Sequence, residues 1–288
     1  MNFILSAEAA CDFTPELAAQ YNVSVMPMKY MVDGTEYRSD DGKMPMSEIC
    51  AKMKSGSKTS TSQPNLVETE EYLTELLKQG KDILHLSFSS AQSGTCANFK
   101  QVAEKLNAEN KNKIYVVDTL CQCSGVGLLI AMVSDEINAK NLTVEQARDY
   151  AESVKLNIDH YFTVDTFTYL ARGGRIPSYL AAIGNIIKIK PVMHLDNAGK
   201  IIPIRKFIGR KRALDDLIRK FSESYNGLSK RIFIGEADCL ADAEYVRGEM
   251  LKAYPDTEIV INPLGPIIVS HSGPGTLALF FTVDERKA

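Results

Sequence analysis

The sequence predicts an α/β protein, in which an N-terminal α/β domain on a parallel sheet is followed by an α+β domain with a largely antiparallel sheet. The chain has 288 residues, enough for about two domains of about 150 residues each. In the first half, short β-rich runs alternate with helical patterns of about 10–15 residues, which is typical of βαβ units. In the second half, a turn signal separates two β-rich runs, as in a hairpin. We expect the domains to span residues 1–158 and 159–288.

Strands and helices are expected in turn through the first half. The first helix, residues 15–21, begins with Thr14 as N-cap and Pro15 at its first position, where both residue types are favoured. Asp33-Gly34 marks a turn after the second strand, and residues 58–64 are expected to form a polar loop. Strands are predicted at 3–6, 23–32, 82–88 and 113–118, and further helices at 47–54, 66–78, 94–106, 125–139 and from 143 to about 157.

The second half is expected to follow a different order. The strands 189–195 and 200–207 flank a turn at Asp196-Asn197-Ala198-Gly199. A basic amphipathic helix is predicted at about 210–224 and another helix at 241–253. Further strands are predicted at 231–236, 258–261, 267–270 and 276–283, the last two separated by Gly273-Pro274-Gly275.

The charge composition argues against a nucleic-acid-binding surface. Lys and Arg total 33 and Asp and Glu total 36, a net charge of −3, whereas such surfaces need a basic excess or a concentrated basic stripe. We therefore expect no nucleic-acid partner. The densest basic stretch is short and fits either a protein-docking surface or a solvated helix start. It consists of Arg205, Lys206, Arg210, Lys211 and Arg212.

Neither a membrane span nor a metal site is expected. No apolar run reaches the roughly 18 residues that a span requires, and residues 1–6 lack the basic region and length of a signal peptide. The protein is therefore expected to be cytoplasmic, with its six cysteines as reduced thiols. Cys121 and Cys123 form C-x-C without a second pair, and the four histidines are dispersed, so no metal or cofactor is predicted.

Two polar loops carry candidate anion-binding residues. Residues 59–64 read Thr-Ser-Thr-Ser-Gln-Pro, and residues 89–95, between a predicted strand and helix, read Ser-Ser-Ala-Gln-Ser-Gly-Thr. Free N–H groups and the positive end of the helix dipole suit a carboxylate or phosphate at such a position. Because Ser and Thr are also favoured helix N-caps, simple capping remains an alternative. The candidate residues are Thr61, Ser62, Ser93, Gly94 and Thr95.

Two later loops add charged candidates. Residues 171–177 read Ala-Arg-Gly-Gly-Arg-Ile-Pro, in which Arg175 is placed to hold an oxyanion. His271 follows Gly265-Pro266 and precedes Gly273-Pro274-Gly275, so it is the histidine of this chain that lies in a Gly-Pro loop. For residues 171–177 the alternative is a helix end with solvated arginines. For His271 the alternative is a structural histidine.

The motifs do not favour catalysis by this chain alone. Ser93, His271 and an aspartate would satisfy the logic of an activated nucleophile, but Gln92-Ser93-Gly94 lacks the G-x-S-x-G elbow. The sequence contains no P-loop and no G-x-G-x-x-G. Several hydroxyl-rich loops indicate donors that share one anion rather than a single nucleophile.

Together these loops resemble the DegV family of bacterial fatty-acid-binding proteins. The matching motifs occur in the family's order and spacing over essentially the whole chain. Each motif alone is weak evidence for the family, but the five together are quite specific. One departure is the N-terminal stretch Glu8-Ala9-Ala10-Cys11-Asp12, where the family typically has an Asp-Ser pair a few residues before an Asp. The motifs are T-S-Q-P at 61–64, S-G-T at 93–95, G-G-R-I at 173–176, K-P at 190–191, and G-P…H-S-G-P-G at 265–275.

The resemblance implies a binding protein rather than an enzyme. It implies an apolar tunnel for the tail of one long-chain fatty acid, with the carboxylate at Thr61 and Ser93, and Arg175 and His271 near the head group. It also implies a separate kinase that uses ATP and Mg²⁺ to convert the presented acid to an acyl phosphate, with transient contact with a membrane surface. Residues 179–187 and 127–130 are candidates for the tunnel wall, with ordinary core packing as the alternative.

Two other functions stay open at this point. One is a stand-alone phosphotransferase or hydrolase that acts on a small substrate at the same site. The other is a carrier or sensor for a different amphipathic acid, without a kinase.

Overall fold

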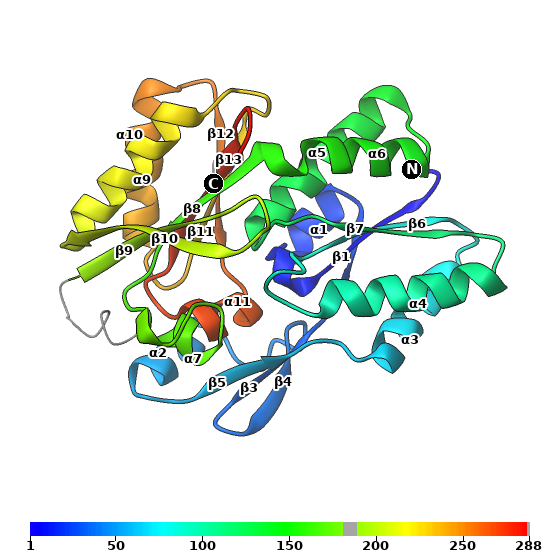
Figure 1. Ribbon diagram of the computed structural model, residues 1–288, viewed down its shortest axis with the longest axis horizontal. Coiled ribbons are helices and arrows are strands. Elements are labelled where there is room, and N and C mark those ends of the chain that lie inside the picture. The colour runs from blue at the N-terminus through cyan, green and yellow to red at the C-terminus, as the bar shows by residue number, and fades with distance from the viewer. Residues whose placement is uncertain (181–188, 287–288) are drawn as a thin grey trace.

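The computed structural model describes residues 1–180 and 189–286. Three sheets organise this part of the chain, with four, six and three strands (Figure 1). The predicted fold class is confirmed, because the first sheet is parallel and the six-stranded sheet is mostly antiparallel. The division into domains 1–158 and 159–288 stays a prediction.

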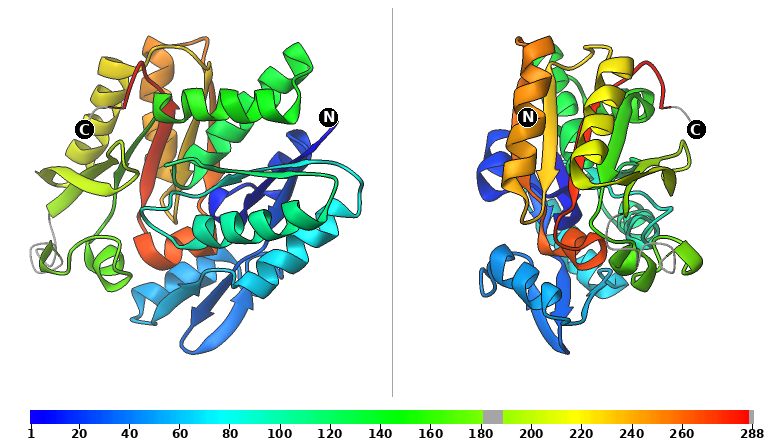
Figure 2. Two further views of the ribbon diagram at one scale, coloured as in Figure 1. Left: turned by 45° about the vertical axis from the view of Figure 1, so that its right-hand side comes forward. Right: turned by 90° about the vertical axis from the view of Figure 1, so that its left-hand side faces the viewer.

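The four-stranded sheet belongs to the first half of the chain. Its strand order is β2-β1-β6-β7, and all neighbours are parallel. Helices α3 (Leu66–Leu77) and α4 (Thr95–Glu109) lie on one side of it, and α5 (Ser124–Lys140) and α6 (Val144–Val154) on the other (Figures 1 and 2). Helix α1 (Pro15–Gln20) begins at Thr14, whose side chain accepts a bond from Leu17 N as predicted. The strands are β1 (Ile4–Glu8), β2 (Val23–Met26), β6 (Ile83–Ser87) and β7 (Ile114–Asp118).

The six-stranded sheet has the order β10-β9-β8-β13-β11-β12. Every neighbouring pair is antiparallel except β11 and β12. Helices α9 (Arg210–Ser224) and α10 (Leu240–Ala253) pack on one face. The predicted hairpin is confirmed, with Ile201 opposite Leu195. The strands are β8 (Ile158–Thr163), β9 (Ile189–Leu195), β10 (Ile201–Ile208), β11 (Arg231–Glu236), β12 (Glu258–Pro263) and β13 (Leu277–Thr282).

Helix α5 joins the two large sheets. It contacts β6 of the first sheet and β8, β11 and β13 of the second, and 12 of its 17 residues are buried. A helix that packs against sheets on two sides needs an apolar surface all round rather than one apolar stripe. This explains why its sequence has so few charges.

A small antiparallel sheet, β4-β3-β5, stands apart from both large sheets (Figure 1). Two predictions are wrong here. The run 23–32 is two strands in different sheets, because residues 27–28 interrupt the pairing between β2 and β3 (Lys29–Val32). The stretch 58–64 is not all loop, because β5 (Thr59–Ser62) pairs with β3. Strand β4 (Thr35–Arg38) completes this sheet, and α2 (Met46–Lys54) follows it in the chain.

Residues 267–270 were predicted as a strand and are helical instead. Helix α11 (Pro266–Ser272) begins with Gly265 as N-cap and Pro266 in its first turn. A short β-branched run cannot be distinguished from a helix by periodicity alone, and here the start signal of the helix prevails. The helix packs against β5 and α7 (Thr168–Arg172), which places His271 on a fixed element rather than in a loop.

Short 3-10 turns, η1 (Ala9–Cys11) and η2 (Lys155–Asn157), follow β1 and precede β8. Strand β8 lies where the sequence prediction had placed no element. Within the described residues, no helix combines the length and apolar character needed to cross a membrane.

Candidate functional site

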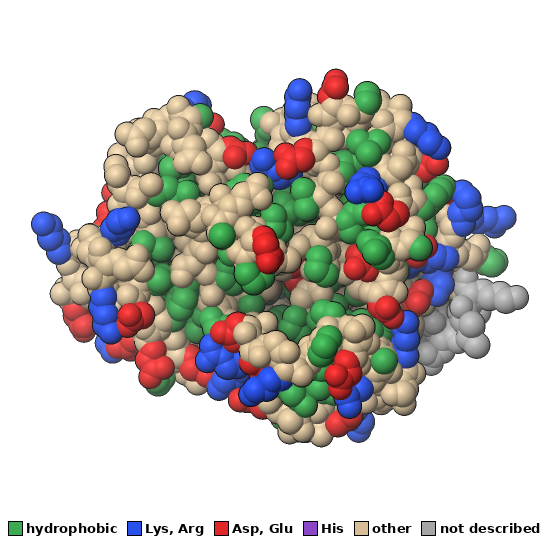
Figure 3. All heavy atoms as spheres, turned by 180° about the vertical axis from the view of Figure 1, so that it is seen from behind, with side chains coloured by type: hydrophobic (Ala, Val, Ile, Leu, Met, Phe, Trp, Pro, Cys, Tyr) green, Lys and Arg blue, Asp and Glu red, His purple; other side chains and the backbone are tan. Residues whose placement is uncertain are grey.

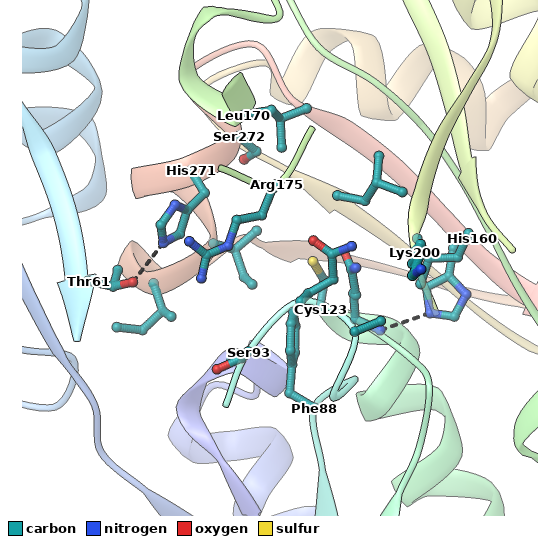
Figure 4. A pocket seen from close by; sticks show the side chains of 18 of the residues that line it. Thr61, Phe88, Ser93, Cys123, His160, Leu170, Arg175, Lys200, His271 and Ser272 are labelled. Carbon is teal, nitrogen blue, oxygen red and sulfur yellow. Dashed lines mark hydrogen bonds between the residues drawn. The ribbon is translucent and has the colours of Figure 1, made fainter. Parts of the chain in front are cut away.

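A cavity of about 900 Å³ opens where the small sheet, α11 and the two large sheets meet (Figure 4). This volume lies within the range of roughly 300–1,000 Å³ that is usual for small-molecule sites. One part of its wall is apolar and another carries hydroxyl, imidazole and guanidinium groups. The apolar wall includes Phe88, Phe162, Leu170, Ile176, Leu195, Ile201, Leu264, Ile267, Ala278 and Phe280.

Strand β5 brings Thr61 to the polar part of the wall. Side chains alternate along a strand, so Thr61 is half-buried and lines the cavity whereas Ser62 is exposed and does not. Thr61 Oγ1 lies 2.6 Å from His271 Nε2, and Thr59 donates to the carbonyl of Ser270 on the same helix. The hydroxyl-rich stretch is thus an edge strand fastened to α11.

The His271 side chain is held in a neutral form. Burial, assisted by the nearby Arg175 guanidinium, lowers the pKa of His271 to about 4. A Cβ on Gly173 would lie 2.3 Å from His271 Nδ1, so only glycine leaves room for the ring. Among the described residues, Nδ1 has no hydrogen-bond partner. The imidazole can therefore exchange a hydrogen bond with Thr61 but carries no charge near neutral pH.

The start of α4 supplies the second set of polar groups. Ser93 Oγ and Thr95 Oγ1 lie 2.8 Å apart, and Ser93 Oγ accepts a bond from Thr95 N. Gly94 is the N-cap, and a Cβ there would lie 2.3 Å from Oε1 of Gln63. Gln63, Ser93, Gly94 and Thr95 all line the cavity. Because the first N–H groups of a helix have no partner within it, this end favours an anion.

Arg175 is the cation of the polar end. Its guanidinium donates to the carbonyl of Gly173 at 2.5 Å, and within the described residues it forms no ion pair with an acidic side chain. Burial lowers its pKa. Figure 4 shows it pointing towards the side of the cavity that holds Thr61, Ser93 and His271. A half-buried guanidinium without an acidic partner has hydrogen-bonding capacity for an anion.

These contacts differ from the arrangement of a serine hydrolase. Ser93 bonds to Thr95, whereas His271 bonds to Thr61. No carboxylate contacts His271 in the part of the chain that the structure describes, so no third group orients the imidazole. What the site offers is a set of donors around one position.

Of the residues suggested for the tunnel wall, those that the structure describes, 127–130, 179 and 180, do not line the cavity. Residues 127–130 are fully buried within α5 and none lines the cavity, so they belong to the core. Of residues 179–187, those from 181 onward lie outside the described residues, and Tyr179 is exposed. The described wall includes alternating residues of β8 and β13, the adjoining ends of β9 and β10, and α11.

The basic stretch near residue 210 is balanced by acids. Arg205 pairs with Asp216 at 3.1 Å and Arg210 with Asp242 at 2.8 Å. Lys211 pairs with an acid one helical turn away. Side chains of both signs are likewise interspersed over the face drawn in Figure 3.

Glu8 is a buried residue of the cavity wall that was not among the predicted site residues. Its carboxylate accepts bonds from Ser87 Oγ and Phe88 N, and its other oxygen lies 3.0 Å from His85 Nε2. It thereby fixes the chain between β6 and the Ser93 loop. Its place at the end of β1 was the available signal, because ligands bind outside the carboxyl ends of parallel strands.

A second polar group was also missed. Gln122, His160 and Lys200 line the cavity and come from three separate segments. Only Gln122, which follows β7, could have been suspected from the same rule on strand ends.

Comparison with known proteins identifies relatives over the whole length. A family model described as uncharacterised proteins of the DegV family matches residues 5–284. A DegV domain-containing protein of Clostridium perfringens is 33% identical over 288 residues, 99% of each chain. A fatty acid-binding protein of Thermotoga maritima is 35% identical over 236 residues, 81% of this chain and 80% of that one. The solved structure of a DegV family protein from Thermus thermophilus, described for its fatty acid binding, superposes with a TM-score of 0.86 at 26% identity, covering 98% of this chain and 100% of that one.

Proposed function

The chain belongs to the DegV family, and from that premise we propose that it binds one long-chain fatty acid in the cavity, with the carboxylate at the polar end. The observation that carries the proposal is the division of one cavity wall into an apolar part and a set of anion donors. The fatty acid binding described for the relatives from Thermotoga and Thermus agrees with it.

The apolar wall supplies most of the affinity. About 14 methylenes that leave water contribute about 0.8 kcal/mol each, on the order of 11 kcal/mol before the costs of binding. A loss of about 3 kcal/mol would leave a dissociation constant of about 1 μM.

The polar end determines which way the acid lies. Thr61 and Ser93 donate hydroxyl hydrogen bonds, Thr95 donates to Ser93, Arg175 supplies a positive charge, and the start of α4 supplies N–H groups. With its proton on Nε2, neutral His271 donates to Thr61 Oγ1, which leaves the Thr61 hydroxyl proton for the acid. A carboxylate buried without such partners would be strongly disfavoured.

The family resemblance further supports presentation of the bound acid to a separate kinase. In this proposal, that kinase brings ATP and Mg²⁺ and transfers a phosphoryl group to the carboxylate, which leaves an acyl phosphate. Hydroxyls suit this role because they solvate the acid and then the acyl phosphate without an activated nucleophile beside them. This chain contributes binding and orientation, and the transfer belongs to the partner.

Mass spectrometry of the purified protein tests the proposal. The native spectrum is compared with the denatured one, and whatever dissociates is extracted and identified. One long-chain fatty acid per chain is expected. A protein that is empty and takes up no added fatty acid contradicts the proposal, whereas turnover of ATP or an ester by the isolated protein favours a stand-alone enzyme.

Two hydroxyl deletions locate the head group. Thr61→Val and Ser93→Ala are expected to weaken retention of the acid by about fivefold to tenfold each, since each removes one hydrogen bond to a charged group. Ser62→Ala, on the same strand but facing away from the cavity, is the matched control and should retain the acid like the parent. Equal retention in all three variants, measured by extraction and titration, would place the carboxylate elsewhere.

A further inference from the structure

We propose that Gln122, His160 and Lys200 form a distal polar site that binds a hydroxyl group on the far half of the acyl chain. The preferred ligands are then long-chain acids with a hydroxyl in that half. This inference rests on the proposed function, because it concerns the tail of the same bound acid.

The distal polar site lies across the cavity from the head-group residues. Figure 4 places Lys200 and His160 on the opposite side from Thr61, Ser93 and His271, with Phe88 and Cys123 between. All of these residues line the same cavity. An acid anchored at the first polar end therefore extends its tail towards the second.

Hydrogen bonds hold the three residues together. The backbone N–H of Gln122 donates to His160 Nε2 at 3.1 Å, and Gln122 Nε2 lies 3.5 Å from the carbonyl of Gly199, next to Lys200. Arg286 fastens the same hairpin, because its guanidinium donates to the carbonyls of Leu120 and Asp196. The site is thus a fixed part of the wall.

The side chain of Gln122 is incompletely hydrogen-bonded. The residue is 7% exposed, yet its amide nitrogen reaches Gly199 only at 3.5 Å, the outer limit of a hydrogen bond. Its amide oxygen has no bond to any residue in the described ranges 1–180 and 189–286. Buried polar atoms are nearly always paired. A methylene packed here would leave the amide oxygen without a partner, whereas a hydroxyl can donate to it and can also accept from the amide nitrogen.

The imidazole of the distal polar site supplies no counter-ion for a second carboxylate. Burial lowers the pKa of His160 well below its ordinary value, so the ring is neutral and acts by positioning Gln122. The buried carboxylate of Glu8 also lines the cavity. Lys200 is exposed and its ammonium forms no ion pair with the described residues, so it serves as a donor at the rim.

A competition experiment with delipidated full-length protein tests the inference. Stearate is compared with 10-, 12- and 17-hydroxystearate against a fluorescent fatty acid. At least one hydroxystearate is expected to bind about fivefold tighter than stearate, the effect of one net hydrogen bond. In a purely apolar cavity, every hydroxyl would weaken binding instead, and that result overturns the inference while leaving fatty acid binding intact. Failure of all four acids to bind overturns the proposed function and this inference together.

Variants assign the preference to the distal polar site. Gln122→Met is expected to remove the preference for the hydroxylated acid while stearate binds as before or more tightly. Lys200→Met, at the exposed rim, is expected to reduce the preference about twofold and keeps the test open if the Gln122 variant does not fold. Lys206→Met, on strand β10, which Lys200 directly precedes, and outside the cavity wall, should leave the preference unchanged. A preference that survives both cavity variants contradicts the assignment.

Discussion

The apolar wall and the polar end of the cavity are built in different ways. Phe162 of β8 and Ala278 of β13 are directly opposite in one sheet, and Phe280 follows two residues later on the same face. The polar end combines β5, the start of α4, the turn after α7, and α11, and its Thr61–His271 contact joins residues 210 positions apart. The wall therefore follows from one sheet register, whereas the polar end depends on four elements at once.

The apolar wall and the polar end also contribute to the binding free energy in different ways. The wall acts through area and tolerates exchange among apolar residues of similar volume. The polar end acts through direction, because each hydrogen bond needs its partner at a fixed distance and angle. Substitutions at the wall should thus change affinity most, and substitutions at the polar end should change orientation and pH response.

Filling the wall should have the largest effect. Ala278→Trp places an indole in the cavity and displaces about five methylenes of the tail, a loss of about 4 kcal/mol or roughly a thousandfold in affinity. Retention of the acid after purification, measured by denaturing mass spectrometry, checks this. Ala253→Trp, at an exposed position on α10, is the control for adding an indole. Full occupancy in the folded Ala278 variant would place the tail elsewhere.

The polar end should respond to pH through His271. Its pKa in the folded protein is about 4, against 6.5 ordinarily. As pH falls below about 6.5, the unfolded chain gains a proton that the folded protein does not, so stability is present above that pH and is lost towards pH 4. The loss approaches about 3 kcal/mol.

Urea unfolding of ligand-free protein at pH 7.5 and 4.5 measures this loss. His271→Gln should show a smaller decrease than the parent over that interval. An identical decrease in the two proteins would contradict the pKa shift of His271.

Removing the cation should weaken binding less than filling the wall does. Arg175→Met keeps much of the side-chain volume and removes one charge-assisted hydrogen bond to the carboxylate, about tenfold in affinity. The methyl ester of the same acid is the matched ligand, and its affinity should change little. Equal losses for acid and ester would mean that Arg175 contributes packing rather than charge.

The sequence predicts the helices and strands of this fold better than it predicts the tertiary contacts between them. Caps and turn residues such as Thr14 and Gly199 specify local structure, so most strands and helices of both halves lie where predicted. The errors fall where short runs are ambiguous. The Thr and Ser hydroxyls of β5 read as loop, and the β-branched run of α11 reads as strand.

The site was accessible to sequence reasoning only in part. Thr61, Ser93 and Arg175 lie in polar motifs beside Gly or Pro, which mark them locally. Gln122 and Lys200 carry no such mark. They meet only because the β9–β10 hairpin folds over the end of β7, and this depends on tertiary packing that periodicity does not encode.

The position of β13 has a consequence for the order of events during synthesis. This strand follows every other described strand in the chain, yet it lies inside the six-stranded sheet, between β8 and β11. Polypeptides fold from the N-terminus as they emerge, domain by domain. A ribosome-bound chain that ends before Leu277 has the four-stranded sheet but lacks Ala278 and Phe280 of the cavity wall. The cavity wall is therefore complete only after β13 has been made and has joined the six-stranded sheet.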